Sequence, residues 1–314
     1  MEKANTIMFE QKPTPLQEIS SAAFSERGIR LFVKRDDLLH SHISGNKWRK
    51  LKYNLFKARE LGNARLLTFG GAYSNHLAAT AAAGQAFGFP TMGIVRGEKV
   101  LPLNPTLKYA EQCGMELKFV SRTNFRAKNH EALFEELKVD PDLFYVLPEG
   151  GSNCLALTGV AELVSETEKQ LGYVPDFIVT ACGTGATLAG LVAGLKGKGR
   201  ALGIPVLKGN FMHDEVAGLL NDCQVNPWAN WETTDGFHFG GYAKFKPELV
   251  HFINDFKSSF GIPLDPIYTG KAAYALFELA SKGYFHKEST VVFLHTGGLQ
   301  GIAGFHERHG HILT

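Results

Sequence analysis

The sequence predicts an α/β protein built on largely parallel sheets. Two observations support this fold class. Apolar runs of strand length alternate with helical patterns along most of the chain, and glycine-rich turns follow several of those runs. Thirty-four of the 314 residues are glycine, which suits many tight turns between elements. In such folds ligands bind at the carboxyl ends of the strands, where the chain turns into a helix.

The first long helix is expected to begin at Lys47. Apolar residues recur every three to four positions from Trp48 onward, while Lys50 falls on the opposite, polar face. Ser44 or Asn46 would cap the start of this helix. Further helices are expected to end near residue 87 and to span about 107–113, 152–171 and 187–195. Short apolar runs predict strands at 66–69, 91–95, 115–120, 144–147, 177–180 and 291–294.

Composition excludes several classes of protein. The formal net charge is +2, which gives no electrostatic case for binding nucleic acid or an anionic membrane. No apolar run reaches 18 residues and the first residues carry no apolar signal core, so we expect a soluble, cytoplasmic protein. Four cysteines lie far apart, at Cys113, Cys154, Cys182 and Cys223. Their spacing forms no pair motif, so we expect buried free thiols and neither a disulfide nor a metal site.

Lys47 is the most informative single residue. A lysine in the first turn of a helix lies near the positive end of the helix dipole, which disfavours a second positive charge. Its amine is therefore easier to deprotonate, and a neutral amine is what attacks an aldehyde to form an imine. Taken alone, Lys47 is more commonly explained as a surface lysine. The glycine-rich turns after the predicted strands decide between a surface lysine and an imine-forming one.

The turn after the strand at 66–69 contains Ser74 and Asn75. Both residues are good helix caps, and capping alone explains them as well as any function does. The functional interpretation is a backbone pocket for a carboxylate, with a hydroxyl beside it for proton transfer.

A second turn, at residues 182–190, has the composition of a phosphate cradle. Its glycines let backbone N–H groups converge on an anion, and Thr184 and Thr187 add hydroxyl donors. A dinucleotide site is disfavoured because Leu188 replaces the third glycine of that fingerprint. The next strand candidate, near 205–207, also lacks the acidic residue that would bind a ribose.

Two more turns place hydroxyl groups near strand ends. Tyr268 precedes a Thr-Gly helix start, where it is either a packing residue or an acid or base facing the cleft. Thr296 follows the apolar strand at 291–294 and offers a neutral hydroxyl.

An imine-forming lysine, a phosphate cradle and a strand-end hydroxyl together suit pyridoxal phosphate, which has an aldehyde, a phosphate and a ring nitrogen. At these residues the chain resembles the pyridoxal-phosphate enzymes with the tryptophan synthase β-subunit fold. Within them it is similar to the D-cysteine desulfhydrase and 1-aminocyclopropane-1-carboxylate (ACC) deaminase group. The resemblance extends from about Lys34 to Gly298. It rests on Lys34-Arg35-Asp36-Asp37 before Gly45-Asn46-Lys47, on Ser74-Asn75-His76, and on Asp265-Pro266-Ile267-Tyr268-Thr269-Gly270-Lys271.

The resemblance implies a role for each matching residue. Lys47 would carry the cofactor covalently and later move protons at the substrate Cα, and Asn75 would bind the ring hydroxyl of the cofactor. Ser74 would bind the substrate carboxylate or take part in proton transfer, while Tyr242 and Tyr268 would flank the substrate. The cofactor phosphate would be bound by Gly183, Thr184, Gly185, Ala186 and Thr187.

The resemblance also implies the architecture: two three-layer α/β/α domains with largely parallel sheets. We expect a larger, discontinuous cofactor-binding domain at 1–50 and 161–314, and a smaller α/β domain inserted at 51–160. The same resemblance implies a homodimer.

Two threonines favour desulfhydrase chemistry within this group. ACC deaminases resemble one another in having a glutamate directly after the tyrosine matched by Tyr268, at the pyridine nitrogen, whereas this chain has Thr269 there. In desulfhydrases a His-Thr-Gly-Gly threonine, matched by Thr296, faces that nitrogen. A hydroxyl does not stabilise a protonated pyridinium. Eliminating hydrosulfide needs less electron withdrawal than opening a cyclopropane ring, so the threonines favour elimination.

The sequence therefore predicts a pyridoxal-phosphate lyase that converts a small amino acid, D-cysteine above all, into a 2-oxo acid and ammonia. Alternatives are an ACC deaminase that forms 2-oxobutanoate, and a pyridoxal-phosphate-binding protein with little catalysis. The second alternative arises because Tyr73 and residues 243–246 depart from the pattern of the family near the expected substrate pocket.

Overall fold

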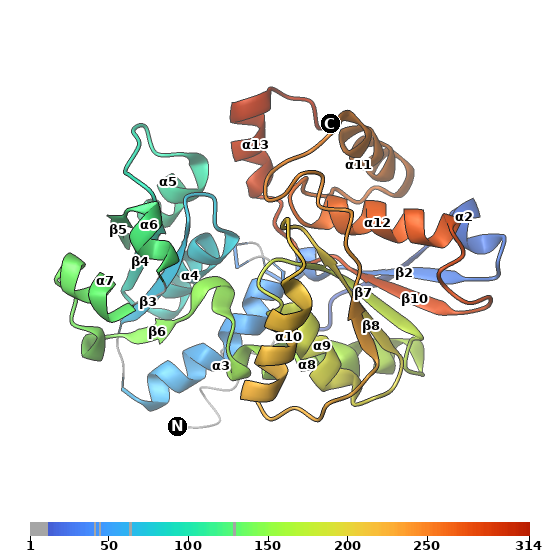
Figure 1. Cartoon of the computed structure of the whole chain (residues 1–314), viewed down its shortest axis with the longest axis horizontal. Coiled ribbons are helices and arrows are strands. Elements are labelled where there is room, and N and C mark those ends of the chain that lie inside the picture. Colours follow the sequence, from blue (N-terminus) through green and yellow to red (C-terminus); the bar gives the residue numbers. More distant parts are fainter. Residues whose placement is uncertain (1–11, 41, 44, 63–64, 128–129) are drawn as a thin grey trace.

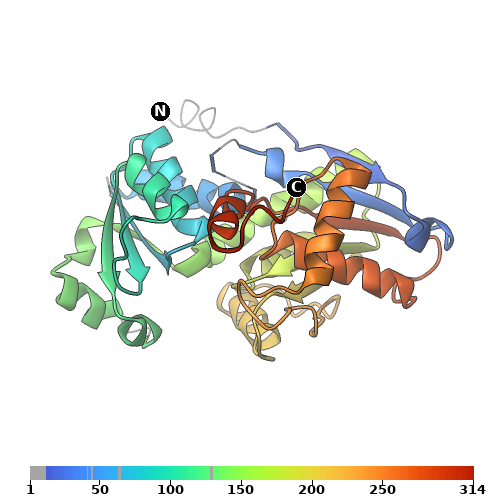
Figure 2. The ribbon, with the colours of Figure 1, turned by 90° about the horizontal axis from the view of Figure 1, so that it is seen from above.

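The computed structural model describes residues 12–40, 42–43, 45–62, 65–127 and 130–314, and it contains two separate sheets. Figure 1 shows the smaller sheet on the left and the larger sheet on the right. Seen from above, helix α13 (Gly301–His309) lies between the elements around the smaller sheet and those around the larger sheet (Figure 2). This arrangement confirms the predicted α/β class.

The larger sheet has six strands in the order β1-β2-β10-β7-β8-β9. Its neighbouring strands pair in parallel, except that β1 runs antiparallel to β2. The strands are β1 (Leu16–Ile19), β2 (Arg30–Lys34), β7 (Phe177–Cys182), β8 (Arg200–Pro205), β9 (Trp231–Thr233) and β10 (Thr290–Leu294).

Helices cover both faces of this sheet and bury its apolar strands. One apolar cluster joins the strands to α2 (Ala22–Ser25), α11 (Pro247–Phe260) and α12 (Thr269–Ser281). The other joins them to α8 (Cys154–Leu171), α9 (Ala186–Leu195) and α10 (Met212–Asp222). Strands buried on both faces are typical of parallel sheets.

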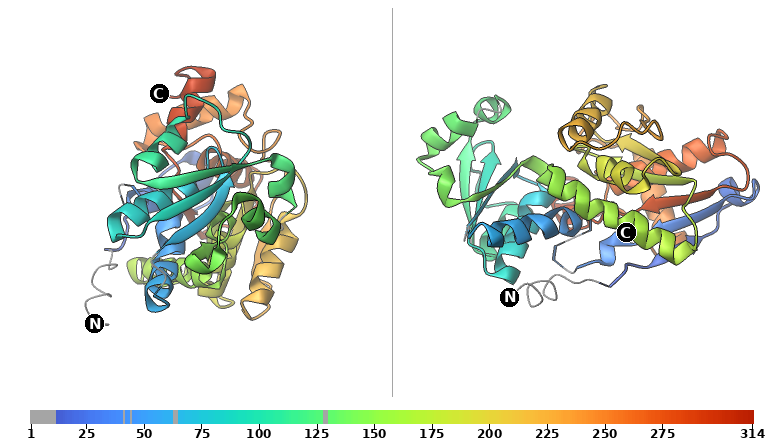
Figure 3. Two further views of the ribbon diagram at one scale, coloured as in Figure 1. Left: turned by 90° about the vertical axis from the view of Figure 1, so that its left-hand side faces the viewer. Right: turned by 90° about the horizontal axis from the view of Figure 1, so that it is seen from below.

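The smaller sheet has four parallel strands in the order β5-β4-β3-β6. One of its faces packs against α3, α4 and α5, and the other packs against α6 and α7. The left panel of Figure 3 shows this sheet from its outer side. Its elements are β3 (Leu66–Gly71), β4 (Thr91–Arg96), β5 (Met115–Val120), β6 (Tyr145–Leu147), α3 (Asn46–Glu60), α4 (Asn75–Phe87), α5 (Pro105–Gln112), α6 (Arg122–Arg126) and α7 (His130–Leu137).

Three short 3₁₀ helices complete the elements: η1 (Asp36–Leu38), η2 (Pro141–Leu143) and η3 (Glu149–Gly151). The four strands of the smaller sheet all fall within the predicted inserted segment 51–160. Both α3 and α8 cross a predicted boundary, and α8 extends from one sheet to the other in the right panel of Figure 3. The exact domain limits stay a prediction.

Several expectations about elements were wrong. The strand expected near 205–207 lies earlier, at β8, and the strands β1, β2 and β9 were not predicted. The predicted cap Asn46 is the first residue of α3, and its side chain instead donates to the Thr187 hydroxyl. Ser44 lies outside the described residues. Lys50, expected on a solvated face, is 2% exposed.

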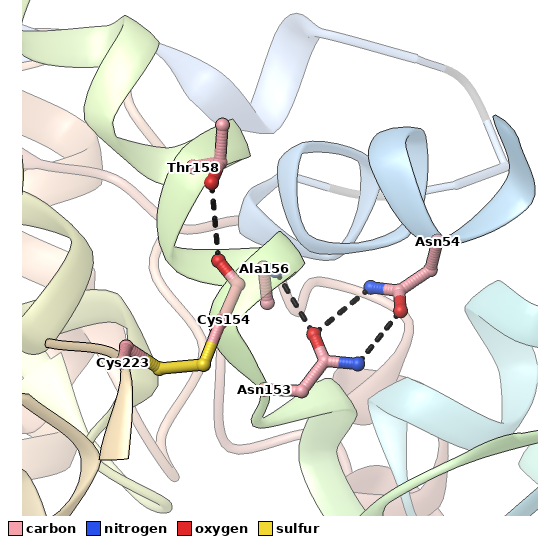
Figure 4. Close-up of a disulfide and its surroundings, with 6 residues drawn as sticks. All are labelled: Asn54, Asn153, Cys154, Ala156, Thr158 and Cys223. Atoms are coloured by element: carbon pink, nitrogen blue, oxygen red, sulfur yellow. Dashed lines mark hydrogen bonds between the residues drawn. A yellow bond between two sulfur atoms is a disulfide. The ribbon is translucent and has the colours of Figure 1, made fainter. Parts of the chain in front are cut away.

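The expectation of free thiols was wrong for two of the four cysteines. Cys154, at the start of α8, forms a disulfide with Cys223, which follows α10 (Figure 4). Cys113 and Cys182 are free. The two bonded residues are 69 positions apart, and they meet because α8 and α10 cover the same face of the larger sheet. Sequence spacing alone does not reveal such a pairing.

Candidate active site

A cavity of about 760 Å³ lies where the carboxyl ends of the strands of both sheets meet. This volume is typical of small-molecule sites. The predicted site residues lining the cavity are Lys47, Ser74, Asn75, Gly183, Thr184, Gly185, Thr187, Tyr242, Tyr268 and Thr296. Ala186 is buried at the start of α9 and is absent from the lining.

Lys47 lies in the first turn of α3 with its amine directed at the loop after β6. Its Nζ donates to the Gly150 carbonyl at 3.2 Å. Burial lowers the pKa of Lys47 to about 8, and the nearby Glu149 carboxylate opposes this shift. The expected direction is therefore confirmed, with loss of hydration as the main cause. An amine with this pKa is partly neutral near pH 8 and can act as a nucleophile.

Close backbone contact fixes where α3 begins. Gly45 has φ 57°, and a Cβ at this position would lie 1.9 Å from the Thr296 carbonyl oxygen. That same carbonyl accepts a hydrogen bond from the Asn46 N–H at 3.2 Å. Only glycine fits there, so the Gly-Asn-Lys segment ties the reactive lysine to the end of β10.

Buried ion pairs hold the next turn of α3. Arg49 donates to both oxygens of Asp36, at 2.6 and 2.8 Å, and to Glu166 on α8 at 3.0 Å. Lys34 at the end of β2 also binds Glu166. The Lys-Arg-Asp-Asp motif therefore orients the helix that carries Lys47, and it lies outside the cavity lining.

The second turn forms a cradle at the start of α9. Gly183 and Gly185 lie between β7 and the helix, and Gly185 has φ 78°. The Thr184 hydroxyl accepts from Ser152 at 2.7 Å, and the Thr187 hydroxyl accepts from Asn46 at 2.8 Å. Backbone N–H groups at a helix N-terminus together with hydroxyls form a site for a phosphate.

Sequence reasoning missed a second buried lysine beside this cradle. Lys50 lines the cavity, and its Nζ donates to Gly150 O at 3.3 Å, so two lysines share one carbonyl. Burial, reinforced by the charge of Lys47, lowers the pKa of Lys50 well below its usual value. Its position one turn after Lys47 was the available signal, because residues three apart on a helix share a face.

The Ser74 turn combines capping with exposure to the cavity. Ser74 Oγ accepts from the His76 and Leu77 N–H groups, which confirms the capping interpretation, and the residue also lines the cavity. The Asn75 amide faces the opposite wall, where a Cβ on Gly298 would lie 2.9 Å from its nitrogen. Neither ring nitrogen of the buried His76 has a partner among the described residues.

Two tyrosines flank the cavity on the side of the larger sheet. The rings of Tyr242 and Tyr268 are 6.1 Å apart in an edge-on arrangement. Loss of hydration raises the pKa of both phenols, and that of Tyr268 rises well above its usual value. Both therefore stay protonated near neutral pH and can donate a proton.

The two threonines singled out from the sequence lie in different surroundings. The Thr269 hydroxyl donates to Asp265 at 2.6 Å and is absent from the cavity lining. Asp265 is itself saturated by N–H groups of the following turn. Thr296 lines the cavity, whereas neither Asp265 nor any other acid at this strand end does.

The departures from the family pattern lie mostly outside the cavity. Tyr73 packs beneath Arg308 of α13, with the guanidinium carbon 3.9 Å from the ring centroid. Phe245 packs against Phe305 and His309 of the same helix, at 4.9 Å in both cases. Neither residue lines the cavity, so these substitutions contact α13 and leave the lining unchanged.

Other classes of site have little support in the part of the chain that the structure describes. It contains no cluster of three histidine, cysteine or acidic residues able to bind a metal ion. None of its helices has the length and apolar character to cross a membrane.

Comparisons with known proteins agree with this geometry. A family model described as pyridoxal-phosphate dependent enzyme matches residues 7–297. The chain is 34% identical to a protein of Pyrococcus abyssi whose assignment as an ACC deaminase is itself provisional, over 94% of this chain and 92% of that one. It is 33% identical to the bifunctional D-cysteine desulfhydrase/ACC deaminase of Arabidopsis thaliana, covering 95% and 79% of the two chains.

A solved structure of an ACC deaminase homologue superposes with a TM-score of 0.82. Its sequence is 31% identical, and the match covers 96% of this chain and 94% of the other. The likeness therefore extends over both sheets and the cavity between them.

Proposed function

Because the chain belongs to the pyridoxal-phosphate dependent enzymes, we propose that it is a lyase that converts a small amino acid into a 2-oxo acid and ammonia. D-Cysteine is the proposed substrate, and with water it would yield pyruvate, hydrosulfide and ammonia. The observation that carries this choice is that a threonine, Thr296, and no acidic residue lines the cavity at the end of β10.

The residues present fit the cofactor. Gly183, a lining residue of the cradle, faces Tyr268, because a Cβ there would lie 3.0 Å from the tyrosine ring. The cradle has the chemistry to hold the phosphate, and the Lys50 amine, which donates to Gly150 O, lines the same cavity. Lys47 supplies the amine for the aldehyde, and Asn75 supplies an amide for the ring hydroxyl. Bound pyridoxal phosphate supplies an electron sink for charge that develops at the substrate Cα.

Side chains of the protein itself transfer the protons. The Lys47 amine, with its pKa near 8, is suited to accept the Cα proton of a bound amino acid. Tyr242 and Tyr268 stay protonated and can donate a proton to the departing hydrosulfide. Ser74, at the start of α4, is suited to bind the substrate carboxylate.

The Thr296 hydroxyl supports elimination over ring opening. A neutral hydroxyl leaves the pyridine nitrogen unprotonated, and the cofactor is then a weaker electron sink. Loss of a good leaving group needs less electron withdrawal than cleavage of a cyclopropane. The competing activity, ACC to 2-oxobutanoate and ammonia, appears in the names of two relatives, one of which is also named as a D-cysteine desulfhydrase. The homodimer stays a prediction from the resemblance, and the cytoplasmic location stays a prediction from the sequence composition.

One experiment separates these activities. The purified holoenzyme is titrated with D-cysteine and, separately, with ACC, while the visible absorption of the cofactor and the 2-oxo acid products are followed. Pyruvate and hydrosulfide from D-cysteine, at a higher kcat/KM than 2-oxobutanoate from ACC, would support the proposal. A faster reaction with ACC would replace it with the deaminase. Spectral shifts without any product would indicate a binding protein.

A further inference from the structure

Two opposite charges line the cavity on the side of the smaller sheet, and neither forms an ion pair with another described residue. Arg96 is the last residue of β4, and Glu149 begins η3, two residues after β6. The strands are ordered β4-β3-β6, so both residues border the turn that follows β3 and contains Ser74. Neighbouring strands are about 5 Å apart, which puts the two backbones roughly 10 Å apart on opposite sides of that turn.

The guanidinium of Arg96 lies beside the turn and packs on an aromatic ring. It pairs with Gly71 across β3 and β4, and a Cβ on Gly71 would lie 3.3 Å from a guanidinium nitrogen. The Phe125 ring packs against the guanidinium, with 5.6 Å between the charged carbon and the ring centroid. No carboxylate pairs with Arg96 within the described parts of the chain. Its charge acts instead on the Tyr242 phenol across the cavity and lowers its pKa against the larger effect of burial.

Glu149 presents the complementary charge. No hydrogen bond or ion pair engages its carboxylate among the residues whose positions are described, and it lines the cavity beside Gly150, which accepts from Lys47. The carboxylate raises the pKa of Lys47 against the effect of burial, and it also raises the pKa of Tyr242 and of Tyr268. Glu149 adjoins Gly150, whose carbonyl binds the Lys47 amine, whereas Arg96 lies at the end of β4 on the other side of the turn.

We propose that Arg96 and Glu149 bind the two charged groups of the incoming amino acid, Arg96 its carboxylate and Glu149 its ammonium. A free α-amino acid is a zwitterion, and an unpaired cation and anion on either side of one turn complement it. The arrangement orients the ligand with its nitrogen toward Lys47 and its carboxylate over the Ser74 turn. Arg96 and Glu149 are therefore specificity-determining residues, and the inference rests on the proposed function.

Binding of D-alanine tests the proposal, because D-alanine lacks a β leaving group and cannot undergo the elimination. The visible spectrum of the holoenzyme reports binding of D-alanine and of its methyl ester, which keeps the amine and lacks the carboxylate. Arg96→Met should weaken D-alanine binding about tenfold to a hundredfold and change ester binding less than about twofold. Glu149→Gln should weaken both ligands by similar factors, because both carry the amine.

Two controls separate the assigned role from a structural one. Arg122→Met removes a neighbouring exposed arginine that is absent from the cavity lining, and it should change neither affinity. Arg96→Lys should recover part of the discrimination between acid and ester. Equal weakening of both ligands by Arg96→Met, or no weakening of either, would overturn the assignment of Arg96. Unchanged affinities in Glu149→Gln would overturn that of Glu149.

The same measurements distinguish failure of the proposed lyase function from failure of the assignment of Arg96 and Glu149. A wild-type holoenzyme whose spectrum responds to no amino acid would overturn the lyase proposal, and this inference with it. A wild-type enzyme that responds to amino acids while both variants bind them unchanged would overturn only the assignment of Arg96 and Glu149.

Discussion

The two walls of the cavity are built in different ways. On the side of the larger sheet, backbone and buried ion pairs fix the site: Gly45 touches the Thr296 carbonyl, and Arg49 is locked by Asp36 and Glu166. On the side of the smaller sheet, side chains with free charges face the cavity, as Arg96 does. The comparison shows that backbone contacts and buried ion pairs position the lysine, while we propose that the charged side chains of the other wall select the amino acid.

The largest expected effect on the fixed wall comes from Lys47→Ala. This variant removes the amine that holds the cofactor and accepts the Cα proton, so turnover should fall to the background rate. Lys57→Ala is the matched control, since Lys57 is partly exposed on the same helix, forms an ion pair with Glu60 and does not line the cavity. Retained turnover in Lys47→Ala, measured as 2-oxo acid formation, would contradict the mechanism.

The second largest effect is expected on the free energy of unfolding, from the buried ion pairs behind this wall. Arg49→Met leaves Asp36, which is 0% exposed, without its bidentate partner. Removing one partner of a buried pair typically costs about 3–5 kcal/mol. Chemical denaturation should show a loss of this size. A loss below about 1 kcal/mol, the range of exposed pairs such as Lys57–Glu60, would show that these ion pairs do not fix the wall.

The pH dependence of cofactor capture sharpens the comparison further. Because burial lowers the pKa of Lys47 from 10.5 to about 8, the neutral amine becomes the major form above pH 8. The rate at which the apoprotein captures pyridoxal phosphate should therefore rise with pH and level off above about 8. Stopped-flow absorbance measures this rate. A rise that continues toward pH 10 would mean that the lysine keeps its usual pKa.

The same shift affects stability. Between pH 8 and 10.5 the unfolded chain holds a proton on Lys47 that the folded apoprotein has released, so the free energy of unfolding should rise with pH in this window. Lys47→Met should lose that part of the slope. An unchanged slope in this variant would assign it to other groups.

The smallest effect is expected from a departure that faces away from the cavity. Tyr73→Phe keeps the ring beneath Arg308 and removes a hydroxyl that does not line the site. Its kcat and KM for D-cysteine should stay within about twofold of wild type. Tyr242→Phe is the contrasting variant, because Tyr242 does line the cavity, and it should lower kcat. A large decrease in kcat in Tyr73→Phe would contradict this expectation and would show that the contact between Tyr73 and α13 affects catalysis.

The fixed wall was the part that sequence could predict. Lys47 begins an amphipathic helix after a small-residue turn, and Gly183 follows an apolar strand and precedes a helix, so both local patterns are visible in the sequence. The free charges were not predicted, because Arg96 and Glu149 stand out only once β4, β3 and β6 are placed side by side. The disulfide between Cys154 and Cys223 was missed for the same reason, since it depends on how α8 and α10 pack.

The most direct test of this account is to find which lysine holds the cofactor. Lys47 and Lys50 are both directed at the Gly150 carbonyl, and burial lowers the pKa of both. The holoenzyme is reduced with borohydride, digested, and mapped by mass spectrometry for the phosphopyridoxyl group. The account predicts the modification at Lys47 alone. Modification at Lys50, or none in a protein that remains yellow before reduction, would contradict it.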